Sequence, residues 1–216
     1  QGFRYRDMLI LSRSSDLYTH IAERVFCKYH IPCFSDYRRP MTEHPVTEAI
    51  IAVLDVLKSH WAYEPLFRLL KTDLLPLNRH DVDTLENYCL AHGIQGYHWL
   101  QNKNWTYYTR HFIDDKVIHS RNEMEYLAHI NEIRHVIYEL VNPLYAASQE
   151  LHTLQQWCTL LYQWLQHSGI IETLRRWKQS DDMQGHAIES KEHEQVFKQI
   201  LELLQELVEL CGDDTV

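Results

Sequence analysis

Residues 31–76 read IPCFSDYRRPMTEHPVTEAIIAVLDVLKSHWAYEPLFRLLKTDLLP, and this stretch decides the fold. After a turn at residues 38–40, a helix is predicted to start near Thr42, with acidic residues and proline in its opening positions. Apolar residues then recur on one side of a 3.6-residue helix, at Val46, Ile50, Val53, Leu54, Leu57 and Trp61. Such a stripe needs a partner surface, so the stretch predicts a packed, mainly α protein.

The segment before this stretch has a different pattern. An apolar run at 8–11 predicts a buried strand, 17–29 a helix, and 33–34 a second strand. One strand, one helix and one strand are too small for a domain, so we expect an incomplete sheet. The predicted organisation is a partial α/β segment over residues 1–37 and a helical inserted arm over residues 38–216.

Beyond residue 76 almost all of the signal is helical. Helices are predicted at 80–92, 121–144 (ended near Pro143), 154–168, 170–177 and 189–211, with an aromatic irregular segment at 97–119 and a polar loop at 180–186. If residues 38–212 form an inserted arm, the last helix should run back beside residues 45–60. It would then bury Leu203, Leu204 and Leu207 near Ile50, Val53 and Leu57, and Tyr37 would lie close to Gly212.

Composition limits the function. A net charge of −9 over 216 residues argues against a dominant nucleic-acid surface, because duplex binding depends on phosphate neutralisation. There is no apolar run of about 18 residues, so we expect no membrane contact and a cytoplasmic location. Five scattered cysteines favour reduced thiols. The chain begins Gln-Gly-Phe, and we expect it to be a fragment of a longer protein.

Candidate catalytic and metal-binding groups are weak. Cys27, His30 and Cys33 approach ligand spacing, but the segment changes from helix to strand between them. His193 is better explained as a histidine hydrogen-bonded on a helix face. The acidic pairs at 81/83, 114/115 and 181/182 stand at helix starts or in loops, where acids act as caps and solvated surface. No phosphate loop occurs. We therefore predict no catalytic residue, no metal ligand and no cofactor in this chain.

Two candidate binding elements remain. Arg13 ends the first predicted strand, where a guanidinium can meet phosphate at the carboxyl edge of a parallel sheet; the alternative is a surface arginine. The segment 99–110 has the composition of a single-strand stacking platform, through Trp99, Lys103, Trp105, Tyr107, Tyr108 and Arg110. Arg38 and Arg39 would add phosphate contacts. The alternative is that the aromatic side chains pin an irregular segment onto a helical core.

Four phrases carry a resemblance to a known family. They are HP followed by an apolar helix (44–57), YEPLFRLLKTDLL (63–75), LENYCLAHGIQG (85–96) and EHEQVFKQILELL (192–204). In this order they resemble AddB (RexB), the second subunit of the bacterial AddAB (RexAB) helicase-nuclease. The first predicted strand is similar to a strand of UvrD-like helicases that ends in Tyr-Arg and contacts nucleotide, although Ser12 stands here in place of the tyrosine.

The resemblance implies a role in DNA repair. The parent complex resects double-strand breaks for recombination, and its ATP and Mg²⁺ sites and iron-sulfur cluster would lie outside this chain. The chain would be a non-catalytic scaffold that shapes the DNA path, touches DNA weakly or indirectly, and packs on the AddA-type subunit. The alternative is a helical protein–protein interaction domain without a DNA role.

Overall fold

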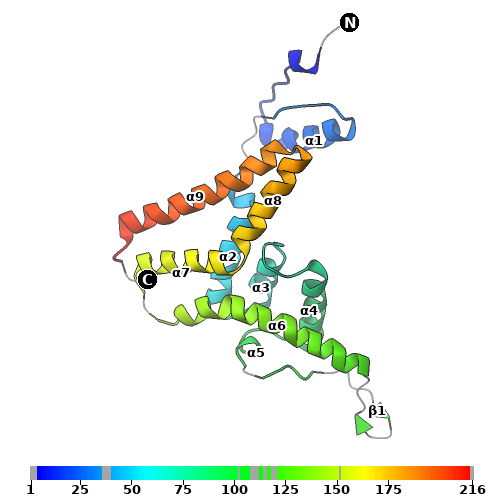
Figure 1. Cartoon of the computed structure of the whole chain (residues 1–216), viewed down its shortest axis with the longest axis vertical. Coiled ribbons are helices and arrows are strands. Elements are labelled where there is room, and N and C mark those ends of the chain that lie inside the picture. The colour runs from blue at the N-terminus through cyan, green and yellow to red at the C-terminus, as the bar shows by residue number, and fades with distance from the viewer. Residues whose placement is uncertain are drawn as a thin grey trace. The chain divides into compact units, whose positions relative to one another are not determined.

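The computed structural model describes residues 4–35, 40–101, 103–107, 112–113, 116–117, 121–150 and 152–214 (Figure 1). The chain divides into two compact units, residues 1–40 and 41–216. The division falls between Pro40 and Met41, close to the boundary expected after residue 37. The identification of the two parts as a motor-like segment and an inserted arm stays a prediction.

The first unit contains a 3₁₀ turn, η1 (Tyr5–Asp7), and the helix α1 (Ser15–Lys28). The predicted helix is present, but neither predicted strand is: residues 8–11 and 31–35 form no ladder. The apolar run is exposed, with Leu9 81% and Leu11 85% accessible. A strand exists only through hydrogen bonds to a neighbouring strand. Within the described residues, neither segment has one.

The second unit is helical, and the prediction of a mainly α fold is confirmed. Its elements are η2 (Met41–Glu43), α2 (Pro45–Lys58), α3 (Tyr63–Leu70), α4 (Arg79–His92), α5 (Tyr97–Leu100), β1 (Phe112–Ile113), β2 (Lys116–Val117), α6 (Arg121–Ala147), α7 (Leu154–His167), α8 (Ile170–Gln184) and α9 (Ala187–Cys211). The two short strands pair antiparallel, with Phe112 opposite Val117. None of the helices in the described ranges combines the length and apolar character needed to cross a membrane.

Helix α2 lies at the centre of this unit. Pro45 occupies its first turn, and the His44 ring caps it by accepting a hydrogen bond from the Val46 N–H at 3.2 Å. Six of its residues are buried: Val46, Ala49, Ala52, Val53, Val56 and Leu57. The two alanines shift the buried face relative to the predicted stripe, so Leu54 is 41% exposed.

Trp61 anchors the corner between α2 and α3. Its fully buried ring stacks on Trp99 at 5.8 Å and on Tyr138 at 6.1 Å between centroids. His60 and Trp61 have φ of 52° and 64°, a left-handed conformation that costs of order 1 kcal/mol for such residues. The aromatic contacts offset this cost, and the Trp61 carbonyl also accepts a hydrogen bond from Gly96 at 2.8 Å.

Two helix ends differ from the prediction. Helix α6 continues through Pro143 to Ala147, because Val141 and Leu144 on either side of the exposed proline are both buried. Residues 180–184, predicted as loop, are the last turn of α8. That turn ends at Gly185, which has φ of 78°, with the His186 N–H bonded to the Asp181 carbonyl at 2.8 Å.

Helix α9 returns along the others, as Figure 1 shows, and packs against α8, α7 and α2. The turn after α9 meets the start of α7: the Leu154 N–H donates to the Asp214 carbonyl at 2.8 Å. The expected contact of α9 with α2 is present. The prediction that Leu203 and Leu207 are buried is wrong, since they are 46% and 36% exposed, whereas Leu204 packs on the core. Tyr37 lies outside the described residues.

Candidate functional site

The irregular segment after α5 is held in place by two polar side chains of α6. Asn131 clamps the backbone of Trp105: its Oδ1 accepts from the N–H at 2.8 Å and its Nδ2 donates to the carbonyl at 3.1 Å. The Arg134 guanidinium donates to the carbonyls of Lys103 (2.9 Å) and Gln101. The backbone at Gln101, Lys103 and Trp105 is therefore held by α6.

Sequence reasoning missed both of these residues, although a signal was present. Arg134 is 8% exposed and stands between Ile130 and Ile137 on the buried face of α6. A charged residue at an apolar position of a helix indicates a specific buried partner, because burying a charge without hydrogen bonds is costly. Here the partners are backbone carbonyls, which the sequence does not display.

The two tryptophans of the predicted stacking platform are core residues. Trp99 is fully buried and Trp105 is 2% exposed. The Trp105 ring stacks on Tyr88 (5.9 Å), lies edge-on to Trp99 (4.9 Å) and faces the Arg134 guanidinium at 5.0 Å. Base stacking needs an open aromatic face. Their burial favours the alternative, in which these side chains pack the segment onto the core, and DNA contact by Trp99 and Trp105 stays a prediction.

The remaining predicted contacts are dispersed or undescribed. Lys103 is exposed, and Tyr107 is 39% exposed with its ring stacked on His92 at 5.8 Å. Arg13 is exposed and follows a segment without a ladder, so no parallel sheet edge is present beside it among the described residues. Four predicted residues lie outside the described ranges: Arg38, Arg39, Tyr108 and Arg110. DNA contact by any of these residues stays a prediction.

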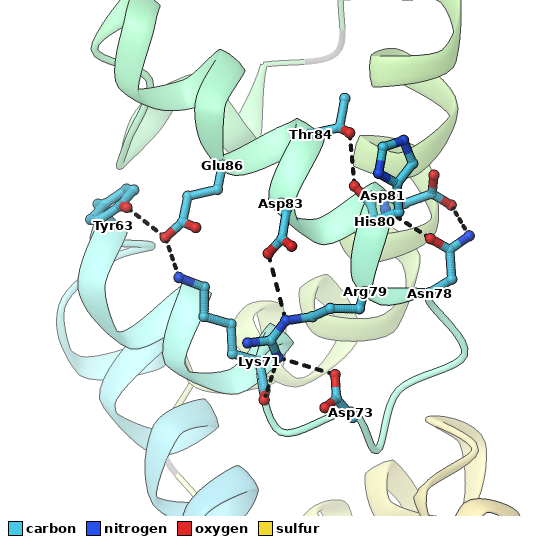
Figure 2. Close-up of polar contacts among 10 residues, drawn as sticks. All are labelled: Tyr63, Lys71, Asp73, Asn78, Arg79, His80, Asp81, Asp83, Thr84 and Glu86. Carbon is cyan, nitrogen blue, oxygen red and sulfur yellow. Dashed lines mark hydrogen bonds and ion pairs between the residues drawn. The ribbon is translucent and has the colours of Figure 1, made fainter.

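A polar cluster joins α3 to α4 (Figure 2). Glu86 accepts hydrogen bonds from the Tyr63 hydroxyl at 2.7 Å and from Lys71 Nζ at 2.6 Å. Burial alone would raise the pKa of Glu86, but the bonds from Lys71 and Tyr63 outweigh it and hold this pKa below its usual value. Burial, together with Glu86, raises the pKa of Tyr63 to about 12. Glu86 is thus a structural anion.

The neighbouring acids are also engaged. In Figure 2 the Arg79 side chain extends toward Asp73 (3.2 Å) and Asp83 (3.5 Å). Asp81 receives Asn78 Nδ2 at 2.6 Å and His129 Nε2 at 2.9 Å. These carboxylates neutralise nearby cations and help to order the α4 N-terminus. In the described part of the chain no three His, Cys, Asp or Glu side chains are placed to hold a metal ion.

A second polar array links α2, α8 and α9. His44 Nε2 lies 2.9 Å from His193 Nδ1, and His193 Nε2 lies 3.1 Å from Asp181 Oδ2. Because His44 Nδ1 already accepts from Val46, His44 must donate through Nε2, and His193 must then donate to Asp181. Burial, and then the nearby His193, lower the pKa of His44 to about 4. The three side chains thus form a continuous series of hydrogen bonds that connects α2, α9 and α8. The prediction that His193 is a hydrogen-bonded histidine on a helix face is confirmed.

A cavity of about 400 Å³ lies between α6 and α7. It is lined mainly by apolar side chains, among them Leu140, Leu144 and Leu160, with Glu139 and His167 at its polar edge. Trp164 also lines it and donates its indole N–H to the Leu140 carbonyl at 3.0 Å. All five cysteines are free, and burial raises the pKa of Cys89 to about 12, which disfavours the reactive thiolate form.

The chain is similar to known proteins along its full length. It is 36% identical over 97% of its length to the AddB-type subunit of the ATP-dependent helicase/deoxyribonuclease of Desulforamulus reducens. Over its whole length it is 35% identical to the same subunit from Bacillus subtilis and 33% identical to the one from Pelotomaculum thermopropionicum. The chain spans about a fifth of the length of these curated relatives (18–19%). No model of a known protein family matches. In sequence, then, the chain is a homologue of one segment of the AddB (RexB) subunits of ATP-dependent helicase/deoxyribonucleases.

Proposed function

We propose that the chain is a non-catalytic structural part of an ATP-dependent DNA helicase/exodeoxyribonuclease subunit that acts in double-strand-break resection and recombinational repair. One observation carries the proposal: 33–36% identity to three AddB-type subunits extends over essentially the whole chain. The chain's place would be to shape the DNA path and to pack on an AddA-type subunit.

The described polar groups support a structural role. Asp81 and Asp83 are bound by His129 and Arg79, and Asp181 is bound by His193. Carboxylates that serve a two-metal nuclease centre must point at the ions and at water. ATP, Mg²⁺ and the iron-sulfur cluster of the parent family would bind outside this chain, and the parent would act in the cytoplasm.

The direct test of the non-catalytic role is an assay of the purified chain. We expect neither ATP hydrolysis nor Mg²⁺-dependent cleavage of linear DNA. Cleavage that co-elutes with the chain, stops on chelation and disappears in Asp81→Asn/Asp83→Asn would contradict the proposal. A helical protein–protein interaction domain without a DNA role is the second candidate, favoured by the burial of Trp99 and Trp105.

A gel-shift experiment distinguishes the two candidates. A duplex with a single-stranded tail should be retarded weakly and only at low salt if the chain lines a DNA path, because the net charge of −9 opposes binding. A chain that binds an AddA-type subunit but no DNA at any salt concentration would favour the interaction domain.

A further inference from the structure

Helix α9 carries an apolar seam, and only the first half of this seam packs on the core. Its members repeat at alternating spacings of four and three residues, which is the spacing of a coiled-coil seam: Val196, Ile200, Leu203, Leu207 and Leu210. Val196 and Ile200 are 5% and 4% exposed and belong to the core. Leu203, Leu207 and Leu210 are 46%, 36% and 80% exposed. The chain covers the first half of the seam and leaves the second half open.

The two edges of the open half differ in character. On one edge, Leu204 packs against the core. On the other edge lie Glu202, Glu206 and Glu209, which follow the same helical repeat. Residues 199–214 contain five acids and no lysine or arginine. Lys198 reaches Glu202 at 3.4 Å, whereas Glu206 has no ion-pair partner among the residues that the structure describes.

We propose that the open seam, Leu203, Leu207 and Leu210, binds an amphipathic helix of another polypeptide whose apolar stripe is bordered by lysine or arginine. The leucines would pack into that stripe as in a coiled coil, and the acidic edge would select basic flanks, as charged flanking positions do in coiled coils. The seam spans about 10 Å, so a partner helix of about three turns covers it. A second α9 would offer only acidic flanks.

The proposal can be tested with designed peptides and the 216-residue chain. The probe is a fluorescein-labelled helix about three heptads long with leucine at the seam positions and lysine at the flanks. One control peptide has glutamate flanks, and another keeps the lysines but has serine in the seam. By fluorescence anisotropy we expect saturable binding of the first peptide, at least roughly tenfold tighter than either control. Equal binding of all three peptides would overturn the proposal.

Variants of the chain locate the site. Leu203→Ser/Leu207→Ser should weaken binding at least roughly tenfold, because the seam loses its apolar contacts. Leu90→Ser on α4 is the matched control, since Leu90 is 60% exposed and should leave affinity unchanged. Glu206→Lys should weaken binding of the lysine peptide and improve that of the glutamate peptide. All four residues are exposed, and thermal melting checks that each variant folds.

Two results would contradict the assignment. One is unchanged affinity in a folded Leu203→Ser/Leu207→Ser variant, which would place the peptide elsewhere. The other is a concentration-dependent dimer of the chain in sedimentation that this double variant abolishes, because the occupant of the seam would then be a second copy.

Discussion

At the scale of single residues, we expect protonation of His44 to lower stability. Its pKa in the folded chain is about 4, below the ordinary value of 6.5, because the ring is buried and lies beside His193. A lowered pKa means that the folded state binds fewer protons than the unfolded state. The stabilisation is therefore complete above about pH 6.5 and is lost as the pH falls toward 4.

We predict that this single group removes up to about 3 kcal/mol of unfolding free energy between pH 7 and pH 4. Asparagine is a good helix cap but is too short to reach His193, so His44→Asn should lower stability at pH 7 and flatten the acid dependence. The matched control is His80→Asn, because His80 is exposed. Urea titrations at pH 7.5 and 5 measure the effect. An acid slope as steep in His44→Asn as in the control would refute it.

Asn131 offers a second prediction at this scale. Asn131→Ala removes both hydrogen bonds to the Trp105 backbone and leaves buried backbone groups unpaired, so we expect a loss of about 1–3 kcal/mol. Lys103→Ala, in the same segment but exposed, should change stability by less than about 0.5 kcal/mol. Thermal unfolding of the two variants checks this, and equal melting temperatures would mean that the clamp contributes nothing.

At the scale of elements, α6 tests the role of a proline inside a helix. Pro143 cannot donate to the carbonyl four residues earlier, and its ring crowds that turn. Since the site is exposed, Pro143→Ala should stabilise the chain by about 1–3 kcal/mol. Asn142→Ala, which changes only helix propensity, is the control. Unfolding in urea gives both values, and a destabilised Pro143→Ala would show that the proline's shape is needed beside the cavity between α6 and α7.

The segment 99–107 gives a prediction about nucleic acid. Lys103 and Tyr107 are the exposed members of the predicted platform within the described residues, so Lys103→Ala/Tyr107→Ala should weaken any single-strand binding without unfolding the chain. Trp105→Ala is not a usable probe, because deleting a buried tryptophan costs about 3–5 kcal/mol. Anisotropy with labelled single-stranded DNA at low salt measures the change. Unchanged binding by the folded double variant would assign residues 99–107 to packing alone.

The same elements show what the sequence could and could not predict. The helices were predictable because apolar residues recur at helical spacing, as from Val46 to Leu57. The extension of α6 beyond Pro143 was not, because burial of Val141 and Leu144 outweighs the local effect of proline. For the candidate site, the sequence predicted where the aromatic segment lies in the chain. It did not predict whether the side chains face solvent or the core, because both arrangements have the same composition. Which arrangement forms depends on contacts with residues far along the chain, such as the contact of Arg134 with Trp105.

At the scale of the whole molecule, the proposed function makes this chain a structural segment of a larger helicase-nuclease complex. Its second unit has its own core around Trp61, and Asp83 and Asp181 are engaged in structural contacts. A part that supplies shape and no chemistry should be replaceable by the matching segment of a relative, provided that the replacement packs on the same partner.

The most direct test of this structural, non-catalytic role is the activity of a chimera. The segment of the Bacillus subtilis relative that aligns with this chain, 35% identical, is replaced by residues 1–216, and the chimera is purified with its AddA-type partner. We expect the complex to assemble and to degrade linear duplex DNA in the presence of ATP. A chimera that folds but fails to pair with the partner, or that pairs and leaves the duplex intact, would contradict it.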